Sequence, residues 1–192
     1  MSPVEWIATA LGIACVLLAA RRSIWTFPVA IVSVILLGVV VFEARLYSDA
    51  LLQLFFVAAN LYGWLTWRRT QARTGDVPVG MLDAAGRTRW SVAILSGWLV
   101  CGAAMHRWTD AALPWLDAGI AAASIAAQLL MAQRRLENWW LWVAVDLASV
   151  PLYLAKGLYL FAGLYAVYLG LALWGLASWS RSARGEWRVV AA

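Results

Sequence analysis

Seven apolar runs, separated by shorter polar stretches, constrain the fold of this chain more than any other feature. They cover approximately residues 4–20, 24–42, 46–67, 90–106, 111–132, 138–155 and 158–179. Most of these runs reach the roughly 20 residues that an α-helix needs to cross a hydrocarbon core about 30 Å thick. The chain is 64% hydrophobic and 13% charged, whereas soluble domains contain about 25% charged residues. We therefore predict an all-α integral membrane protein, in which seven transmembrane helices form a single domain over residues 1–192.

The basic residues predict how these helices are oriented. Of the 15 Lys and Arg, twelve fall in the connections on one side and three on the other. Short cytoplasmic loops carry an excess of Lys and Arg, so the side with twelve should face the cytoplasm. The N-terminus would then lie outside and the C-terminus inside, with the first run a retained helix rather than a signal peptide. The same positions explain the net charge of +5 without a nucleic-acid partner.

The sequence also contains an internal repeat. Pairs that match at an offset of 112 include Leu46 and Leu158, Gly63 and Gly175, and Trp67 and Trp179. Residues 16–22 resemble 129–135 at an offset of 113, and the starts of the next runs agree at 115. We expect a 3+1+3 arrangement: three helices over about 4–67, a connecting helix over about 90–106, and three more over about 111–179. The odd connecting helix makes both triplets run in the same direction, an architecture in which transporters bind substrate between the repeats near the midplane.

Polar and aromatic residues inside the apolar runs are the candidates for a binding site. They are Gln53, Asn60, Trp64, Gln128, Asn138, Trp139, Trp142, Asp146 and Tyr153. Within the third and sixth runs, most of them recur at spacings of 3, 4 and 7, which places them on one helical face. Lipid offers no hydrogen-bond partners, so these faces should look inward. Indole rings beside a buried carboxylate suggest a pocket for a flat ligand that is cationic or polar and aromatic.

Packing roles for these residues stay open. Amide and hydroxyl side chains also join transmembrane helices, so any single amide can serve packing alone. Asp146 lies near the middle of its run, where a charge needs a partner, and that partner can be an arginine or an amide instead of a ligand.

No catalytic or metal-binding pattern emerges from the sequence. His106 is the only histidine, Cys15 and Cys101 lie far apart, and no GxxxxGK[ST] phosphate-binding stretch occurs. We therefore expect no enzymatic activity, no cofactor and no metal. Asp146 is the only deeply placed acid and no buried base accompanies it, so facilitated passage of a solute fits better than proton coupling.

Several stretches of the chain resemble one family. They are Glu137–Trp142, Asp146 to Tyr153, Lys156–Tyr159, Gln53–Asn60, Tyr62–Trp64 and Ala127–Met131. The first of them contains a WxxW element, formed by Trp139 and Trp142. On these residues the chain resembles the PnuC family of bacterial B-vitamin transporters. The resemblance covers most of the sequence and is least clear in the first two runs and near residues 75–88.

The resemblance implies a seven-helix 3+1+3 fold similar to that of SWEET-type sugar transporters, a homotrimer, and a place in the bacterial inner membrane. It implies uptake of a vitamin by facilitated diffusion, with phosphorylation in the cytosol trapping the substrate. By position, the residues that would contact substrate are Trp139, Trp142, Gln53, Asn60 and Gln128. At Asp146 and Tyr153 the match concerns residue type more than role.

The family's usual substrate is nicotinamide riboside, and other members carry thiamine or riboflavin. We expect nicotinamide riboside, with thiamine as the alternative, because both carry an aromatic cation that suits indole faces and a carboxylate, at ~0.5–2 kcal/mol for each contact. A neutral riboflavin ring would gain less from Asp146. A different class of protein, a membrane scaffold that transports nothing, would have no need for inward-facing amides.

Overall fold

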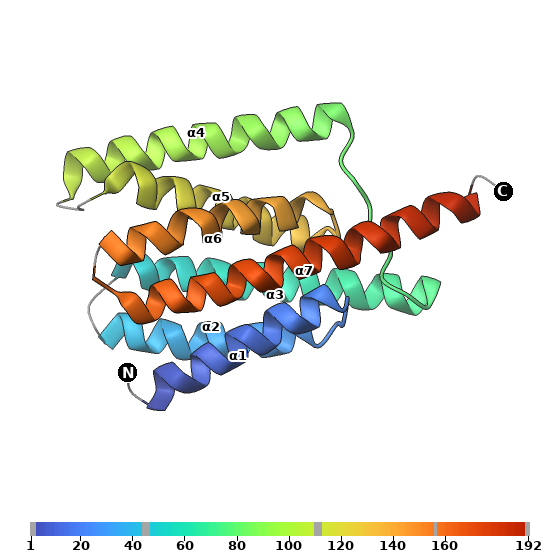
Figure 1. The fold of residues 1–192 in the computed structure, drawn as a ribbon, viewed down its shortest axis with the longest axis horizontal. Coiled ribbons are helices and arrows are strands. Elements are labelled where there is room, and N and C mark those ends of the chain that lie inside the picture. Colours follow the sequence, from blue (N-terminus) through green and yellow to red (C-terminus); the bar gives the residue numbers. More distant parts are fainter. Residues whose placement is uncertain (1–2, 44–46, 110–112, 156, 191–192) are drawn as a thin grey trace.

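The structure is a computed structural model that describes residues 3–43, 47–109, 113–155 and 157–190. Leu46 and Lys156, which belong to the predicted repeat and to the family resemblance, lie outside the described residues. Within them the chain folds into helices, which are α1 (Pro3–Ala20), α2 (Thr26–Glu43), α3 (Tyr47–Thr74), α4 (Ala84–Trp108), α5 (Pro114–Ala132), α6 (Glu137–Ala155) and α7 (Tyr159–Val190) (Figure 1). The predicted all-α fold is confirmed.

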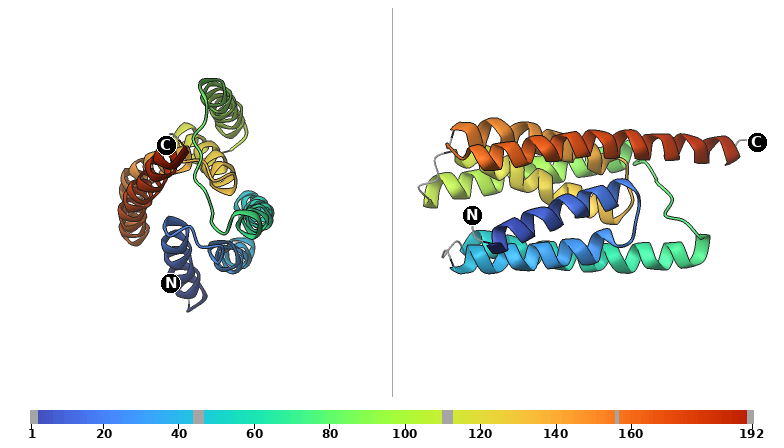
Figure 2. Two further views of the ribbon diagram at one scale, coloured as in Figure 1. Left: turned by 90° about the vertical axis from the view of Figure 1, so that its right-hand side faces the viewer. Right: turned by 60° about the horizontal axis from the view of Figure 1, so that its bottom comes forward.

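Six of the helices close into a ring. Helices α1, α2 and α3 pack against one another in chain order, and so do α5, α6 and α7. We call these two groups the first and the second triplet. The triplets meet along two seams, where α1 packs against α7 and α3 against α5. Helix α4 packs mainly against α5 and reaches α6 through an ion pair between Arg87 and Glu137 at 3.2 Å, so it lies outside the ring (Figure 2).

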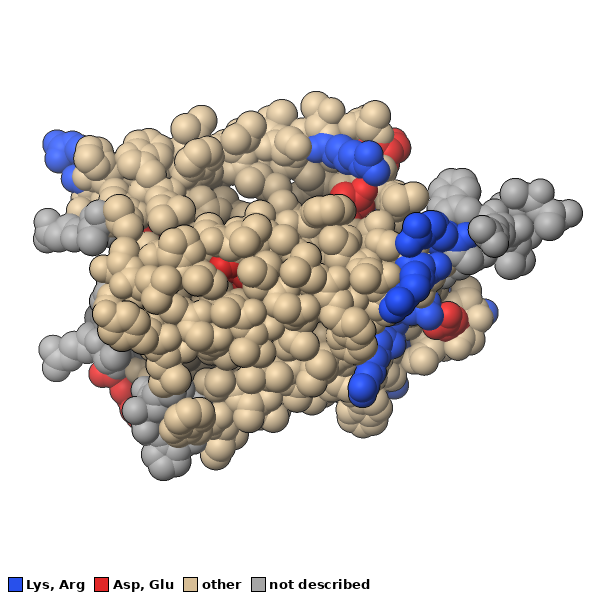
Figure 3. Space-filling model, in the orientation of Figure 1, with Lys and Arg blue, Asp and Glu red and all other residues tan. Residues whose placement is uncertain are grey.

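The surface is that of a protein immersed in lipid. Helical segments long and apolar enough to cross a membrane are Ala50–Thr74, Pro114–Ala132 and Tyr159–Arg184, and shorter apolar helical segments are Trp6–Ala20 and Thr26–Val40. On the face drawn in Figure 3, Lys and Arg gather mainly at one end, and most of the surface beside them is neither acidic nor basic. We call this the arginine-rich end. Its exposed members include Arg21, Arg68, Arg69, Arg73, Arg87, Arg89, Arg181 and Arg184.

Three helices extend beyond the apolar runs that predicted them. Helix α3 continues seven residues past position 67, so the polar connection to α4 is only residues 75–83. In the extension the hydroxyls of Thr70 and Thr74 donate to carbonyls one turn back, and the helix ends at Gly75, whose φ is 76°. An apolar run marks where a helix crosses lipid, whereas its backbone hydrogen bonds continue into the polar region.

The turns that follow α1 and α5 have the same geometry. Arg22 and Arg134 both adopt a left-handed backbone conformation, with φ of 58° and 59°. In each turn the N–H of this arginine donates to the carbonyl three residues back, and the next N–H donates to the carbonyl five residues before it. This is a Schellman-type helix end. The two turns correspond at an offset of 112, so the offset of 113 read from the sequence for this segment is wrong by one residue.

A second correspondence lies at the starts of α2 and α6. The ring of Phe27 lies against Gly63, and the ring of Trp139 lies against Gly175, so closely that a Cβ atom on either glycine would overlap the ring. Glycine thus lets a large ring approach the third helix of each triplet. Both members of each pair differ by 112 from their counterparts, so the offset of 115 expected here is also wrong. Similar aromatic residues at unrelated positions produced the false match.

Most of the buried apolar side chains gather toward the arginine-rich end. The cluster contains Ala19, Ala20, Phe27, Trp67, Val77, Val79, Met131, Trp139, Val143, Ala172, Trp179 and Ala183. Phe27, Trp67, Trp179 and Trp139 form a row of rings with successive centroid distances of 4.9, 5.8 and 5.6 Å. Favourable aromatic pairs contribute about 0.5–1.5 kcal/mol beyond burial. The six helices of the ring are therefore held closed at this end.

Candidate functional site

One face of α6 carries buried polar groups that have no partner in the described part of the protein. The indole Nε1 of Trp142 and the hydroxyl of Ser149 are both buried without a hydrogen bond. Asp146 lies between them, is 4% exposed, and forms no hydrogen bond or ion pair with a described residue. Spacings of four and three place all three side chains on one face. A buried polar atom without a partner costs about 1–3 kcal/mol, so water or a ligand must complete this face.

Tyrosines from α6 and α7 surround the carboxylate. Tyr153 stacks on Tyr165 with ring centroids 5.1 Å apart, and Tyr165 meets Tyr168 edge to face at 5.9 Å. Tyr165 and Tyr168 both lie within electrostatic range of Asp146. The hydroxyl of Tyr168 contacts Gly12 of α1, across the seam between the triplets. Aromatic faces and a carboxylate together form an environment that attracts an organic cation.

Sequence reasoning proposed Tyr153 but missed Tyr165 and Tyr168. Tyrosines in a long apolar run are usually assigned to packing, and the apolar run of α7 has no charged residue to draw attention to them. Their spacing of three, which puts two hydroxyls on one helical face, is the signal that could have identified them.

The two predicted amides Asn60 and Gln128 meet at the seam between α3 and α5. Gln128 Nε2 donates to Asn60 Oδ1 at 3.0 Å, and Asn60 Nδ2 donates to the carbonyl of Phe56 at 2.8 Å. Both side chains are buried. The contact joins the two triplets, which is the packing role that the sequence left open for amides.

Gln53 and Trp64, the other candidates on α3, are half-buried. Gln53 lies next to Gly38 of α2. Trp64 packs against the buried cluster, and the guanidinium of Arg68 lies over its ring, 5.6 Å from the centroid. Trp64 therefore links the buried cluster to the arginine-rich end.

Asn138 and Trp139 are fully buried at the start of α6, within the arginine-rich end. Asn138 Nδ2 donates to the carbonyl of Arg135 at 2.6 Å, and Asn138 Oδ1 has no partner among the described residues. The ring of Trp139 is enclosed between Gly175 and Trp179, 5.6 Å from the latter, and its Nε1 is also without a described partner. The described contacts thus place Asn138 and Trp139 at the arginine-rich end, and Asn60 with Gln128 at the seam between α3 and α5.

Two hollows lie away from these residues. One of about 420 Å³ is an apolar groove between α4, α5 and α6, and one of about 300 Å³ lies beside the C-terminal part of α7. Neither is lined by any of the nine candidates. Neither of these two hollows therefore reaches the polar row on α6.

The turn between α5 and α6 contains an arginine, Arg134, whose pKa is shifted from its ordinary value. Burial, reinforced by the charge of Arg135, lowers the pKa of Arg134 below its ordinary value. Its Nη1 has no hydrogen-bond partner among the described residues. This guanidinium is pressed into the protein rather than projecting into water.

A ring of apolar helices in which α6 carries buried polar groups without described partners is typical of a multi-pass membrane transporter. The model of the nicotinamide mononucleotide transporter family matches residues 2–181. The chain belongs to this family of transporters, which includes PnuC.

Individual relatives match nearly the whole chain. The nicotinamide riboside transporter PnuC of Escherichia coli (strain K12) is 30% identical over 210 residues, covering 96% of this chain and 87% of that protein. The riboflavin/roseoflavin transporter RibM of Streptomyces davaonensis is 34% identical over 193 residues, covering 97% of this chain and 88% of that protein. A crystal structure of the vitamin B3 transporter PnuC matches with a TM-score of 0.76 at 27% identity, over 94% of this chain and 82% of that one.

These matches confirm the predicted PnuC family and the helical membrane fold. They also confirm a B-vitamin transporter rather than an enzyme. Together with the apolar helices, they make the chain a multi-pass protein of the inner membrane.

Proposed function

We propose that the protein takes up nicotinamide riboside by facilitated diffusion, with cytosolic phosphorylation trapping the substrate. The proposal rests on the row of Trp142, Asp146 and Ser149: the indole Nε1 and the hydroxyl are buried without a described partner, and Asp146 between them is 4% exposed. Nicotinamide riboside carries a flat aromatic cation and a ribose. The cation suits an indole face and a carboxylate, and the ribose hydroxyls suit the Ser149 hydroxyl and nearby amides.

The proposed substrate-binding residues fall into two groups. The first group is spread along α3, α5 and α6 and consists of Gln53, Asn60, Trp64, Gln128, Trp142, Asp146 and Tyr153. Asn138 and Trp139 form the second group, which would reach substrate only when the arginine-rich end opens. Asn60 and Gln128 would exchange part of their mutual hydrogen bonding for bonds to the ligand.

The test of this proposal is uptake of labelled nicotinamide riboside by liposomes that contain the pure protein, without ATP or an ion gradient. We expect saturable uptake. Trp142→Ala should weaken binding roughly tenfold in titration calorimetry, since it removes an aromatic face from a cation. Trp140→Ala is the matched control, because Trp140 is on the same helix and is 60% exposed. Equal affinities of the two variants would refute the assignment of Trp142.

Two other vitamins are candidate substrates and can be compared with nicotinamide riboside on the same purified protein. Thiamine, an aromatic cation, is the first alternative. Riboflavin becomes a candidate because the Streptomyces relative named as a riboflavin/roseoflavin transporter is 34% identical. A thermal-shift comparison of the three vitamins ranks them directly. If none produced saturable flux, a membrane scaffold without transport activity would be the better interpretation.

We further propose that the triplets are parallel repeats in a 3+1+3 arrangement within one membrane domain, over about 4–67 and 111–179, with α4 as the connection. The repeated turns and ring–glycine contacts at one offset support this arrangement. The arginine-rich end would face the cytoplasm, which places the N-terminus outside and the C-terminus inside. A homotrimer is proposed from family resemblance, and native mass spectrometry in detergent measures it.

A further inference from the structure

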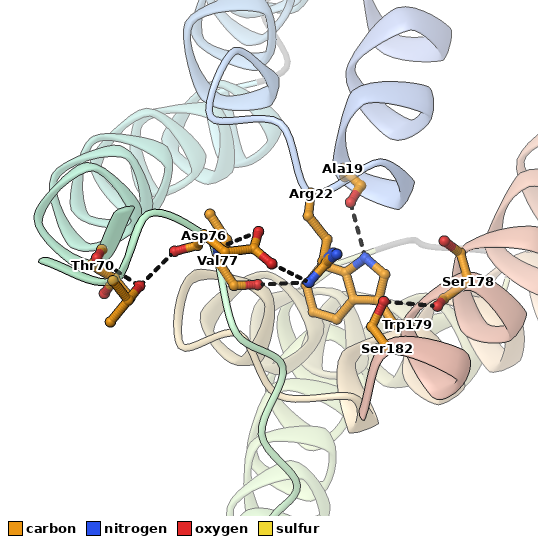
Figure 4. A network of polar contacts seen from close by, with 9 residues as sticks. Ala19, Arg22, Thr70, Asp76, Val77, Ser178, Trp179 and Ser182 are labelled. Carbon is orange, nitrogen blue, oxygen red and sulfur yellow. Dashed lines mark hydrogen bonds and ion pairs between the residues drawn. The ribbon is translucent and has the colours of Figure 1, made fainter. Parts of the chain in front are cut away.

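Two tryptophans connect the triplets at the arginine-rich end by hydrogen bonds that cross in opposite directions. Trp67 on α3 donates its Nε1–H to the carbonyls of Met131 and Ala132 on α5, each at 3.2 Å. Trp179 on α7 donates its Nε1–H to the carbonyl of Ala19 on α1, at 3.0 Å (Figure 4). Each bond thus runs from the third helix of one triplet to the end of the first helix of the other.

These bonds reach carbonyls in the last turns of α1 and α5, where the helix supplies no i+4 donor. The carbonyls of Ala19 and Met131 also accept the N–H groups of Arg22 and Arg134, so each indole adds a second donor there, and Trp67 in addition donates to the carbonyl of Ala132. Both Trp67 and Trp179 are fully buried. If the triplets separate at this end, both indole Nε1–H groups lose their acceptors together and the carbonyl of Ala132 loses the Trp67 donor, whereas the carbonyls of Ala19 and Met131 keep the N–H groups of Arg22 and Arg134.

A strap, residues 75–83, covers the same end. It is the connection between α3 and α4, and in Figure 2 it crosses the end of the bundle. Val77 and Val79 of the strap are buried and belong to the apolar cluster. The strap therefore plugs the end of the ring with apolar side chains rather than passing over it in solvent.

The strap is bonded to the corresponding turn of each triplet. In the first, Arg22 Nη1 donates to the carbonyl of Val77 at 3.2 Å and lies 3.3 Å from a carboxylate oxygen of Asp76 (Figure 4). In the second, the N–H of Gly80 donates to the carbonyl of Arg134 at 3.0 Å, and the N–H of Leu136 donates to the carbonyl of Gly80 at 2.9 Å.

We propose that Trp67, Trp179 and the strap are the closed gate of the transport pathway at the arginine-rich end. This inference rests on the proposed transport function, but it does not depend on which vitamin is carried. A solute held beside Asp146 leaves toward this end only after the two crossed bonds break and Val77 and Val79 withdraw. Trp139, enclosed behind Trp179, becomes accessible in the same step.

The alternative is a permanent fulcrum. In that case the triplets would pivot about this end without separating, and the buried cluster would never meet water. The two interpretations differ in one observable: whether weakening the crossed bonds exposes the interior of the arginine-rich end.

The experiment uses a reporter thiol in the full-length protein. Cys15→Ser and Cys101→Ser remove the native thiols, and Ala172→Cys places a thiol on α7, where Ala172 is 1% exposed in the buried cluster. The rate of its reaction with a charged methanethiosulfonate reagent is measured without substrate. A failure of this test is therefore separate from a failure of vitamin uptake.

The gate variants are Trp67→Phe and Trp179→Phe, which keep an aromatic ring but remove the donor. A hydrogen bond of ordinary net strength changes an equilibrium about fivefold. We expect thiol labelling to accelerate about fivefold in each variant and about 25-fold in the double variant. Trp140→Phe is the control, because Trp140 is largely exposed on α6 and should leave the rate unchanged.

An unchanged labelling rate in a folded double variant would overturn the gate and favour the fulcrum. If the double variant does not give a monodisperse protein, Val77→Ala with Val79→Ala tests the strap alone and leaves both crossed bonds in place. We expect this variant to accelerate labelling as well. An unchanged rate there would equally overturn the proposal.

Discussion

Gln128 on α5 donates a 3.0 Å hydrogen bond to Asn60 on α3, and this contact joins the two triplets inside the membrane. The pair holds one seam of the ring at a place where lipid cannot supply a partner. It also has the chemistry to bind a ribose or a carboxamide. Measurements of stability and of transport distinguish the packing role of the pair from a role in substrate binding.

Replacing one member of the pair should be worse for stability than replacing both. Gln128→Leu leaves Asn60 Oδ1 buried without a donor, which should lower the free energy of unfolding by about 1–3 kcal/mol. The double variant Asn60→Leu with Gln128→Leu should recover most of that loss. Thermal unfolding in detergent measures both variants. If the double variant regains stability but not uptake, the two amides bind substrate. If it regains both stability and uptake, the amides have a packing role only.

Asp146→Asn should separate charged from neutral vitamins. The change keeps the shape of the side chain but removes the anion beside the tyrosines. Uptake of nicotinamide riboside and thiamine should fall roughly tenfold, whereas riboflavin flux should change little, because cation–π and ionic contacts favour only the positively charged rings. Flux is measured in liposomes for all three compounds. Equal losses would mean that Asp146 has a structural role.

Ser149→Ala should affect binding and stability in opposite directions. The Ser149 hydroxyl is fully buried and has no described partner, so its removal should not destabilise the empty protein and should stabilise it by up to about 1 kcal/mol. Affinity for substrate should nevertheless fall by about fivefold, the value of one net hydrogen bond. Thermal unfolding measures the expected change in stability, and calorimetry on the same preparation measures the expected loss of affinity. A loss of stability would show that the hydroxyl already has a partner.

Gly63→Ala and Gly175→Ala should both destabilise the arginine-rich end. The added methyl groups would overlap the rings of Phe27 and Trp139, and overpacking of this kind costs about 1–3 kcal/mol. Gly170→Ala is the control, since nothing lies within 4 Å of the added carbon. In the control, the better helix propensity of alanine should raise stability slightly. Similar melting temperatures for all three variants would contradict the close ring–glycine contacts.

The sequence was sufficient to predict the helices but not their ends. Bilayer thickness fixes how long an apolar run must be, so each of the seven runs became one helix. The ends of α3 and α7 depend on hydrogen bonds in polar segments that hydropathy does not detect.

The site was only partly predictable, because residue spacing shows which side chains share a face of a helix but not which residues of other helices pack against that face. The spacing of Trp139 and Trp142 predicts a common side of α6, yet it cannot show that Trp179 encloses only the first of them. The gate was missed for the same reason. Its tryptophans are 112 residues apart, and their acceptors are backbone carbonyls that carry no sequence signature.

The offset of 112 that relates the turns and the ring–glycine contacts pairs Asp146 with Val34, Ser149 with Leu37 and Tyr165 with Gln53. In the proposed repeat, Asp146 and Ser149 therefore have apolar counterparts on α2, whereas Tyr165 corresponds to Gln53, itself a proposed substrate contact. A solute bound beside Asp146 would therefore form more of its proposed contacts with the second triplet than with the first. If the triplets separate during release, a solute would lose fewer contacts when the first triplet moves away than when the second does.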